Sequence, residues 1–168
     1  MDYTAKIKKL LQVKGTEEGF PLYLESLKDP DFRVRKVALE GLLQHYPPER
    51  LIDRLIEFLY IEDNAAARNT AIEALINIGP QALKSLESAF RTENHDVRKF
   101  IVDVAGQMNT PRAVPLLLKA IQDEDENVRA AAAEYLGKLK AKEAVAPLIR
   151  MLQEEDLWVK YSVLEALG

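Results

Sequence analysis

The sequence predicts an all-α protein built as an α-solenoid, in which similar helix pairs stack side by side. A five-residue phrase recurs in which an acidic or amide residue stands four positions before a base, and these bases are Arg35, Arg68, Arg98, Arg129 and Lys160. The bases follow one another after 33, 30, 31 and 31 residues, a nearly constant period that is typical of stacked repeats. Apolar residues three and four positions after each base form a stripe that one helix would bury against a neighbour.

The recurring phrase predicts the first helix of each pair. Asp125 has the side chain of an N-cap, the alanines at 130–133 favour helix, and Gly137 stands where a left-handed residue could end the helix. The same pattern recurs along the chain, including Asp156 as the cap of the last copy. We therefore expect first helices at 3–13, 31–45, 63–78, 94–108, 125–138 and 156–167.

Short breaks, several of them marked by proline, predict the second helices. Proline in a first turn does little harm, because the N–H that it lacks would have no partner there. Prolines compatible with such positions are Pro80, Pro111, Pro115 and Pro147. Second helices are expected at 16–28, 48–60, 80–91, 111–122 and 142–153.

These helices define one array of about five pairs followed by an unpaired helix. The expected units are 1–28, 29–61, 62–92, 93–123, 124–154 and the half unit 155–168. The last helix keeps an apolar stripe, whereas stacked repeats normally end in a polar cap. We therefore expect that the chain is a fragment of a longer array, or that this end contacts another molecule, including a second copy in end-to-end self-association.

Composition restricts the class of function. The chain has 168 residues, 48% hydrophobic and 30% charged, which predicts a folded protein. A net charge of −4 argues against nucleic acid or an acidic membrane as partner, and no cysteine is present for disulfides or thiolate metal sites. No apolar segment fits a signal peptide or a membrane span, so the expected location is cytoplasmic.

Residues 125–137 and 142–152 resemble the two halves of a HEAT repeat, specifically the short phycobilisome-lyase-like subclass. The resemblance covers nearly the whole chain, is strongest over 94–168, and is weakest in the first pair, which lacks the Val-Arg phrase. It implies a right-handed solenoid whose second helices line a concave binding face. Proteins with this architecture include adaptors, regulators and chromophore lyases.

The repeated polar residues favour structural roles over catalysis. Each base lies one turn beyond its cap residue, at a spacing where side chains meet, so we interpret the base column as part of the scaffold. We expect Arg98→Ala to lower stability. A second column is always acidic and recurs once per unit, as a solvated helix face or a polar row between repeats would; it consists of Glu40, Glu73, Asp103, Glu134 and Glu165.

No catalytic, cofactor or metal site is predicted. Some HEAT-repeat hydroxylases hold a di-iron centre through repeated His-Glu pairs, but here only His95-Asp96 comes near that pattern, and His45 is followed by Tyr46. HEAT-like DNA glycosylases would need a basic groove with aromatic residues. The chain also lacks a nucleophile elbow and a glycine-rich phosphate loop.

The leading hypothesis is a non-catalytic scaffold that binds a protein or peptide on its concave face. The outward stripe of the second helices changes from acidic to basic along the chain, and Trp158 stands in a column otherwise held by Arg33, Ala66, Asp96 and Asn127. Trp158 is expected either to anchor a partner or to pack on a following helix. The candidate partner-binding residues are Arg50, Glu57, Lys84, Arg91, Arg112, Lys119, Arg150 and Trp158. The alternatives are a bilin lyase or lyase-like subunit, and a regulatory segment of a larger multidomain protein.

Overall fold

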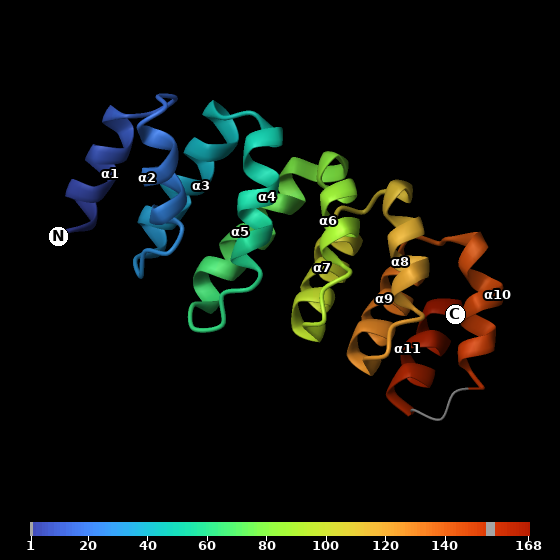
Figure 1. Ribbon diagram of the computed structural model, residues 1–168. Coiled ribbons are helices and arrows are strands. Elements are labelled where there is room, and N and C mark those ends of the chain that lie inside the picture. Colours follow the sequence, from blue (N-terminus) through green and yellow to red (C-terminus); the bar gives the residue numbers. More distant parts are fainter. Residues whose placement is uncertain (1, 154–156) are drawn as a thin grey trace. The chain divides into compact units, whose positions relative to one another are not determined.

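The protein is an all-α solenoid of paired helices (Figure 1). The computed structural model describes residues 2–153 and 157–168, and within these ranges it contains eleven α-helices, three short 3-10 helices and no strand. The predicted cap Asp156 lies outside the described residues. The chain divides into two compact units, Met1–Ile78 and Gly79–Gly168, which are described separately.

The N-terminal unit contains two complete helix pairs and one further first helix. The first helices α1, α3 and α5 pack in sequence, while α2 packs on α3 and α4 packs on α5. The bounds are α1 (Tyr3–Gln12), α2 (Gly19–Ser26), α3 (Phe32–His45), α4 (Pro48–Phe58) and α5 (Ala65–Ile78). Between the layers lie fully buried side chains that include Leu10, Tyr23, Leu42, Leu55 and Leu75.

The C-terminal unit repeats the same two-layer packing. The first helices α7, α9 and α11 pack on one another, and the second helices α6, α8 and α10 pack against them. The first layer consists of α7 (His95–Gln107), α9 (Glu126–Lys138) and α11 (Leu157–Leu167). The second layer consists of η1 (Gly79–Ala82) with α6 (Leu83–Ala89), η2 (Pro111–Ala113) with α8 (Val114–Ala120), and η3 (Lys142–Ala144) with α10 (Val145–Met151).

The predicted first helices are confirmed together with the caps that lie in the described residues. Side-chain oxygens of Asp31, Asn64, Asn94 and Asp125 each accept a hydrogen bond from a backbone N–H two or three residues later. Each cap thereby satisfies an N–H that has no partner within the first turn. The periodic phrase is thus a helix-start signal in this fold.

The second helices of the C-terminal unit are shorter than predicted. Each begins with a 3-10 turn, and Pro115 and Pro147 then lie in the first turns of α8 and α10. Their far ends tighten as well, since the N–H of Gln122 donates to the carbonyl of Lys119 three residues earlier. The predicted range 111–122 is therefore divided between η2, α8 and a closing turn.

Gly137 does not end its helix in a left-handed conformation, so that expectation was wrong. It lies inside α9, and a Cβ placed on it would be 2.5 Å from the Cα of Ala166 in α11. The left-handed residue after α9 is Lys140, whose φ is 51°. Position 137 requires a residue without a side chain, because the backbones of α9 and α11 approach closely there.

No helix within residues 2–153 and 157–168 is long and apolar enough to cross a membrane.

Candidate functional site

The arginines of the base column have a structural role. They bind backbone carbonyls, whereas the repeat spacing suggested the cap side chains as partners. Arg35, Arg98 and Arg129 each donate from a guanidinium nitrogen to the backbone carbonyls five and six residues earlier, at distances of 2.7–3.0 Å. Arg68 donates to the carbonyl of Ile61. Through these bonds the arginines hold the backbone of the loop that precedes their own first helix.

Arg98 also joins two successive repeats of the C-terminal unit. Its Nε and one terminal nitrogen donate to the carboxylate of Asp123 at 2.8 and 2.9 Å, and the two side chains are 6% and 5% exposed. The hydrogen bonds and charge of Asp123 raise the pKa of Arg98. A buried, two-point ion pair of this kind resists separation, because either partner alone would leave a charge without compensation.

The first pair contains an equivalent contact that sequence reasoning missed. Lys6 lies 29 residues before Arg35, close to one repeat period, and its Nζ is 2.6 Å from Asp29 Oδ2. Burial alone would raise the pKa of Asp29, but hydrogen bonds from Lys6 and the Asp31 N–H, with the Lys6 charge, lower it. Asp29 stands two residues before its cap, as Asp123 does, so Lys6 takes the place of the missing arginine.

The acidic column has the solvated character that was predicted. Glu40, Glu73, Glu134 and Glu165 are exposed. Asp103 is partly buried, lies 2.8 Å from Lys99 Nζ, and accepts a long bond from the Tyr135 hydroxyl. The residues of this column were predicted to recur once per unit and not to form carboxylate pairs within a unit. The structure places each of them on a different first helix.

The candidate residues of the N-terminal unit are paired within the fold. Arg50 makes two hydrogen bonds of 2.7 Å with Glu17, and its guanidinium carbon lies 4.0 Å from the centre of the Phe20 ring. The hydrogen bonds and charge of Arg50 lower the pKa of Glu17. Glu57 is paired with Arg54 at 3.1 Å. The acidic stripe predicted for this unit is therefore partly neutralised by its own bases.

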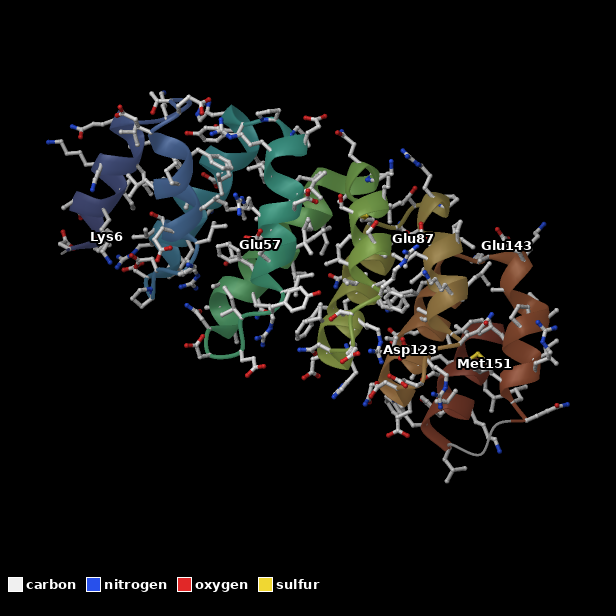
Figure 2. The ribbon with its side chains drawn as sticks, in the orientation of Figure 1. Lys6, Glu57, Glu87, Asp123, Glu143 and Met151 are labelled. Atoms are coloured by element: carbon white, nitrogen blue, oxygen red, sulfur yellow. The ribbon has the colours of Figure 1, made fainter. Side chains whose placement is uncertain are left out.

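The candidate bases of the C-terminal unit remain on its surface. The second-helix face, as we call it, consists of the exposed residues Lys84, Arg91, Arg112, Lys119 and Arg150. None of these five forms an ion pair with a carboxylate in the described part of the chain. Glu87 on α6 and Glu143 on η3, both labelled in Figure 2, form no ion pair with these bases in the described part of the chain. The second-helix face is therefore rich in uncompensated positive charge.

A hollow that includes Arg150 of this face lies between the turn after α8, α9 and α10. Its volume is about 550 Å³. The wall includes Asp123 and Met151, which Figure 2 labels in the C-terminal unit. Among the described residues, those that line it are Ile121, Gln122, Asp123, Arg129, Pro147, Arg150 and Met151. Of the predicted residues, Arg150 lines the hollow, and Lys119 lies on α8 with its Nζ 5.9 Å from the Phe90 ring centre. The periodic pattern placed Gln122 in the outward stripe of the second helices, but it gave no sign of the hollow, because each alignment column was read without its neighbours in space.

Trp158 belongs to a separate apolar surface on α11. It is 58% exposed and stacks on Tyr161, with ring centres 6.2 Å apart and planes 15° apart. Leu157 and Leu164 are also exposed on this helix. The opposite side, with Val159 and Val163, is buried where α11 packs on α9. The outer side of α11 thus presents large apolar side chains to solvent.

The histidines do not join a cluster of potential metal ligands in the described ranges. His95 Nδ1 lies 3.5 Å from Asp125 Oδ2, and both residues lie at helix starts. Within residues 2–153 and 157–168, no group of three or more His, Asp or Glu side chains is placed to hold a metal ion. His45 is exposed at the end of α3.

The two-layer stack, the base column that binds the loops between repeats and the charged second-helix face define a helical-repeat scaffold. A family model for HEAT repeats matches residues 20–100 and 83–168. The chain belongs to the HEAT-repeat family.

Two solved structures illustrate the shared fold. One is the complex of CpcE and CpcF of phycocyanin lyase from Nostoc, with a TM-score of 0.62 and 22% identity over 90% of this chain and 99% of that chain. The other is human deoxyhypusine hydroxylase, with a TM-score of 0.58 and 21% identity over 99% of this chain and 79% of that chain. A search of curated protein sequences gives no significant match. At these identities the similarity concerns the fold, and it includes proteins that take part in catalysis.

Proposed function

We propose that the protein is a scaffold that binds another protein or an extended peptide through the second-helix face of its C-terminal unit. The observation that carries this proposal is the group of five exposed bases without an ion-pair partner among the described residues. The Glu17–Arg50 and Glu57–Arg54 pairs of the N-terminal unit provide the contrast, because there the equivalent surface is neutralised internally.

The charge of the surface specifies the chemistry of the partner. The whole chain has a net charge of −4, so a cluster of bases is a local feature and not a reflection of overall composition. Complementary charges guide a partner to the correct surface and increase its association rate, most strongly at low salt. The proposed partner is therefore an acidic protein segment.

Selection from a random peptide library on the immobilised protein tests this proposal. We expect enrichment of peptides rich in Asp and Glu, and loss of that enrichment with Lys119→Glu combined with Arg150→Glu. The matched control combines Lys8→Glu with Lys14→Glu, which changes the net charge equally at exposed bases of the N-terminal unit. Selection without acidic enrichment, or equal loss in the control, would contradict the proposal.

A bilin lyase or lyase-like subunit is the alternative, and the similarity to the CpcE and CpcF complex over 90% of the chain supports keeping it. The test is co-expression with a bilin and a phycobiliprotein acceptor. Visible absorbance that stays with the acceptor after denaturation would favour the lyase. A scaffold without lyase activity leaves the acceptor colourless under the same conditions.

We further propose that α11 supports end-to-end self-association, with its outer side covered by α1 of a second copy. The exposed Leu157, Trp158, Tyr161 and Leu164 supply an apolar surface of the kind that protein interfaces bury. Such a head-to-tail contact joins successive copies into chains or closed rings, so in either case the average mass should rise with protein concentration. Sedimentation equilibrium should show this rise, its loss with Trp158→Ser, and its persistence with the control Tyr60→Ser. A concentration-independent monomer would contradict self-association.

A further inference from the structure

We infer that the second-helix face binds an acidic peptide in the polyproline II conformation, with a carboxylate side chain at every third residue. This inference rests on the proposed function and specifies the sequence pattern of its ligand. It concerns three exposed bases of the second-helix face, which we call the basic row: Arg91, Lys119 and Arg150.

The basic row supplies one base at the end of each second helix of the C-terminal unit. Lys119 and Arg150 lie in the last turns of α8 and α10, and Arg91 lies just after the end of α6. A base is favoured at such a position, because the backbone dipole leaves negative partial charge at the C-terminal end of a helix. Since the second helices end in the same way, the interval between the bases follows from the stacking of the repeats.

Contacts within the unit leave the charge of the row available to a ligand. The Lys119 Nζ lies 5.9 Å from the ring centre of Phe90, the residue directly before the first base of the row. Lys119 therefore reaches toward the end of the preceding second helix. Asp123 and Glu124 lie in the loop after α8, and both pair with Arg98. These two carboxylates are thus held by a base outside the row.

The interval between repeats selects the conformation of the ligand. The first helices α7, α9 and α11 pack on one another, and packed helices lie about 8–10 Å apart. We expect the second helices that pack against them to repeat at about the same interval. Polyproline II has three residues per turn and rises about 3.1 Å per residue, so every third side chain points the same way at intervals of about 9.3 Å. A β-strand presents side chains on one face about 6.6 Å apart and does not match.

The chemistry of the face argues against an α-helical ligand. Residues seven apart in an α-helix would also fit the interval, at about 10.5 Å. An amphipathic helix, however, is normally bound by an apolar groove. The structure describes α6 and α8 completely, and neither has an exposed large apolar side chain; their outward residues include Lys84, Ser88 and Pro115. A ligand held by charge gains most when its conformation is already formed, as it is in a proline-rich segment.

Fluorescence anisotropy at low salt with three labelled peptides tests this inference. Two have the same composition: Glu-Pro-Pro-Glu-Pro-Pro-Glu has the matching interval, and Glu-Pro-Glu-Pro-Glu-Pro-Pro does not. The third is an alanine-rich helical peptide with three glutamates seven residues apart. We expect the matching peptide to bind about three to ten times more tightly than the others, because exposed ion pairs are individually weak and only this peptide forms all three. Its advantage should shrink as the salt concentration rises.

Two variants separate the basic row from the rest of the face. Lys119→Ala removes the central base and should bring the affinities of the two proline peptides to within about twofold of each other. Arg112→Ala is the matched control, because Arg112 is an exposed base of the same face outside the row. It should weaken both peptides alike and preserve the ratio of their affinities.

The possible results separate this inference from the proposed function. If both proline peptides bind equally and both are lost with the Lys119→Glu and Arg150→Glu variant, the basic face stands and the inferred spacing is wrong. If the helical peptide binds most tightly, the polyproline II conformation is wrong. If none of the three binds, both proposals are contradicted. A labelled single-stranded oligodeoxynucleotide that binds as tightly as the matching peptide would also overturn a peptide-specific site. The comparison of peptides on the unmodified protein needs no variant to fold.

Discussion

Replacement of Arg98 by alanine should strongly destabilise the protein. Arg98 and Asp123 have side chains that are 6% and 5% exposed, so solvent screens their interaction little. The substitution leaves the Asp123 carboxylate buried without its partner, and it removes donors from the carbonyls of Thr92 and Glu93. Loss of one member of a buried ion pair typically lowers the free energy of unfolding by about 3–5 kcal/mol.

That loss is a large share of the total stability of an ordinary protein, which is about 5–15 kcal/mol. Guanidinium denaturation followed by circular dichroism measures it, with the slope of the transition checked for two-state behaviour. The double variant with Asp123→Ala should lose less than the sum of the two single variants, because both remove the same interaction.

Arg112→Ala is the matched control, because Arg112 is an exposed arginine of the same unit without an ion pair in the described residues. It should change the free energy of unfolding by no more than about 0.5 kcal/mol. If Arg98→Ala lowers stability as little as Arg112→Ala does, the assignment of the base column to the scaffold is refuted.

Three further predictions concern other contacts. Gly137→Ala should destabilise by about 1–3 kcal/mol in the same denaturation assay, despite the better helix propensity of alanine, because the new Cβ would overlap Ala166 at 2.6 Å; a neutral result would contradict the close helix packing. The Arg33 side-chain and backbone hydrogen bonds lower the pKa of Asp31 from 3.8 to about 2, so its stabilising effect is complete above pH 3.8 and is lost as the pH falls toward 2. An NMR titration should show that pKa rising in Arg33→Ala. Lys6→Ala should cost about 1 kcal/mol, less than Arg98→Ala because its ion pair is more exposed, and hydrogen exchange in α1 should speed up; unchanged exchange would count against its role as the missing base.

Much of the fold was predictable because it depends on local chemistry that repeats. Asp31, Asn64, Asn94 and Asp125 cap their own helices through bonds that span two or three residues, and such bonds are visible as a sequence pattern. The apolar stripe has the same property, since one period of sequence produces one face of a helix. The helix pairs and their order follow from these two signals.

Contacts between distant residues were less accessible from the sequence. Glu17 lies in a loop and is 33 residues from Arg50, so aligning the repeats gave no reason to pair them. The interpretation of Gly137 failed for a related reason. A glycine near a helix end usually adopts the left-handed conformation that ends the helix. Here the position requires glycine because Ala166 in the following repeat leaves no room for a side chain.

The candidate site was predicted as a list of residues, mostly bases, and not as a three-dimensional surface. Lys119 and Arg150 were chosen because they are polar and face outward in a helix pattern. The hollow that Arg150 lines depends on how the turn after α8 packs beside α9 and α10. Gln122 lines it from a closing turn, at a position that had been predicted as helix. Its depth is a property of the packing, which no single column of the repeat describes.

The glycines inside the first helices limit how the repeats of this protein could be rearranged. A Cβ on Gly106 would be 2.1 Å from the ring of Tyr135, and Gly137 stands in the same relation to Ala166. The repeats that contain α7 and α9 therefore each carry a recess shaped for a residue of the following repeat. A repeat moved to another position, or duplicated, would need to bring its neighbour's matching residue, so pairs of adjacent repeats are the natural modules for engineering this array.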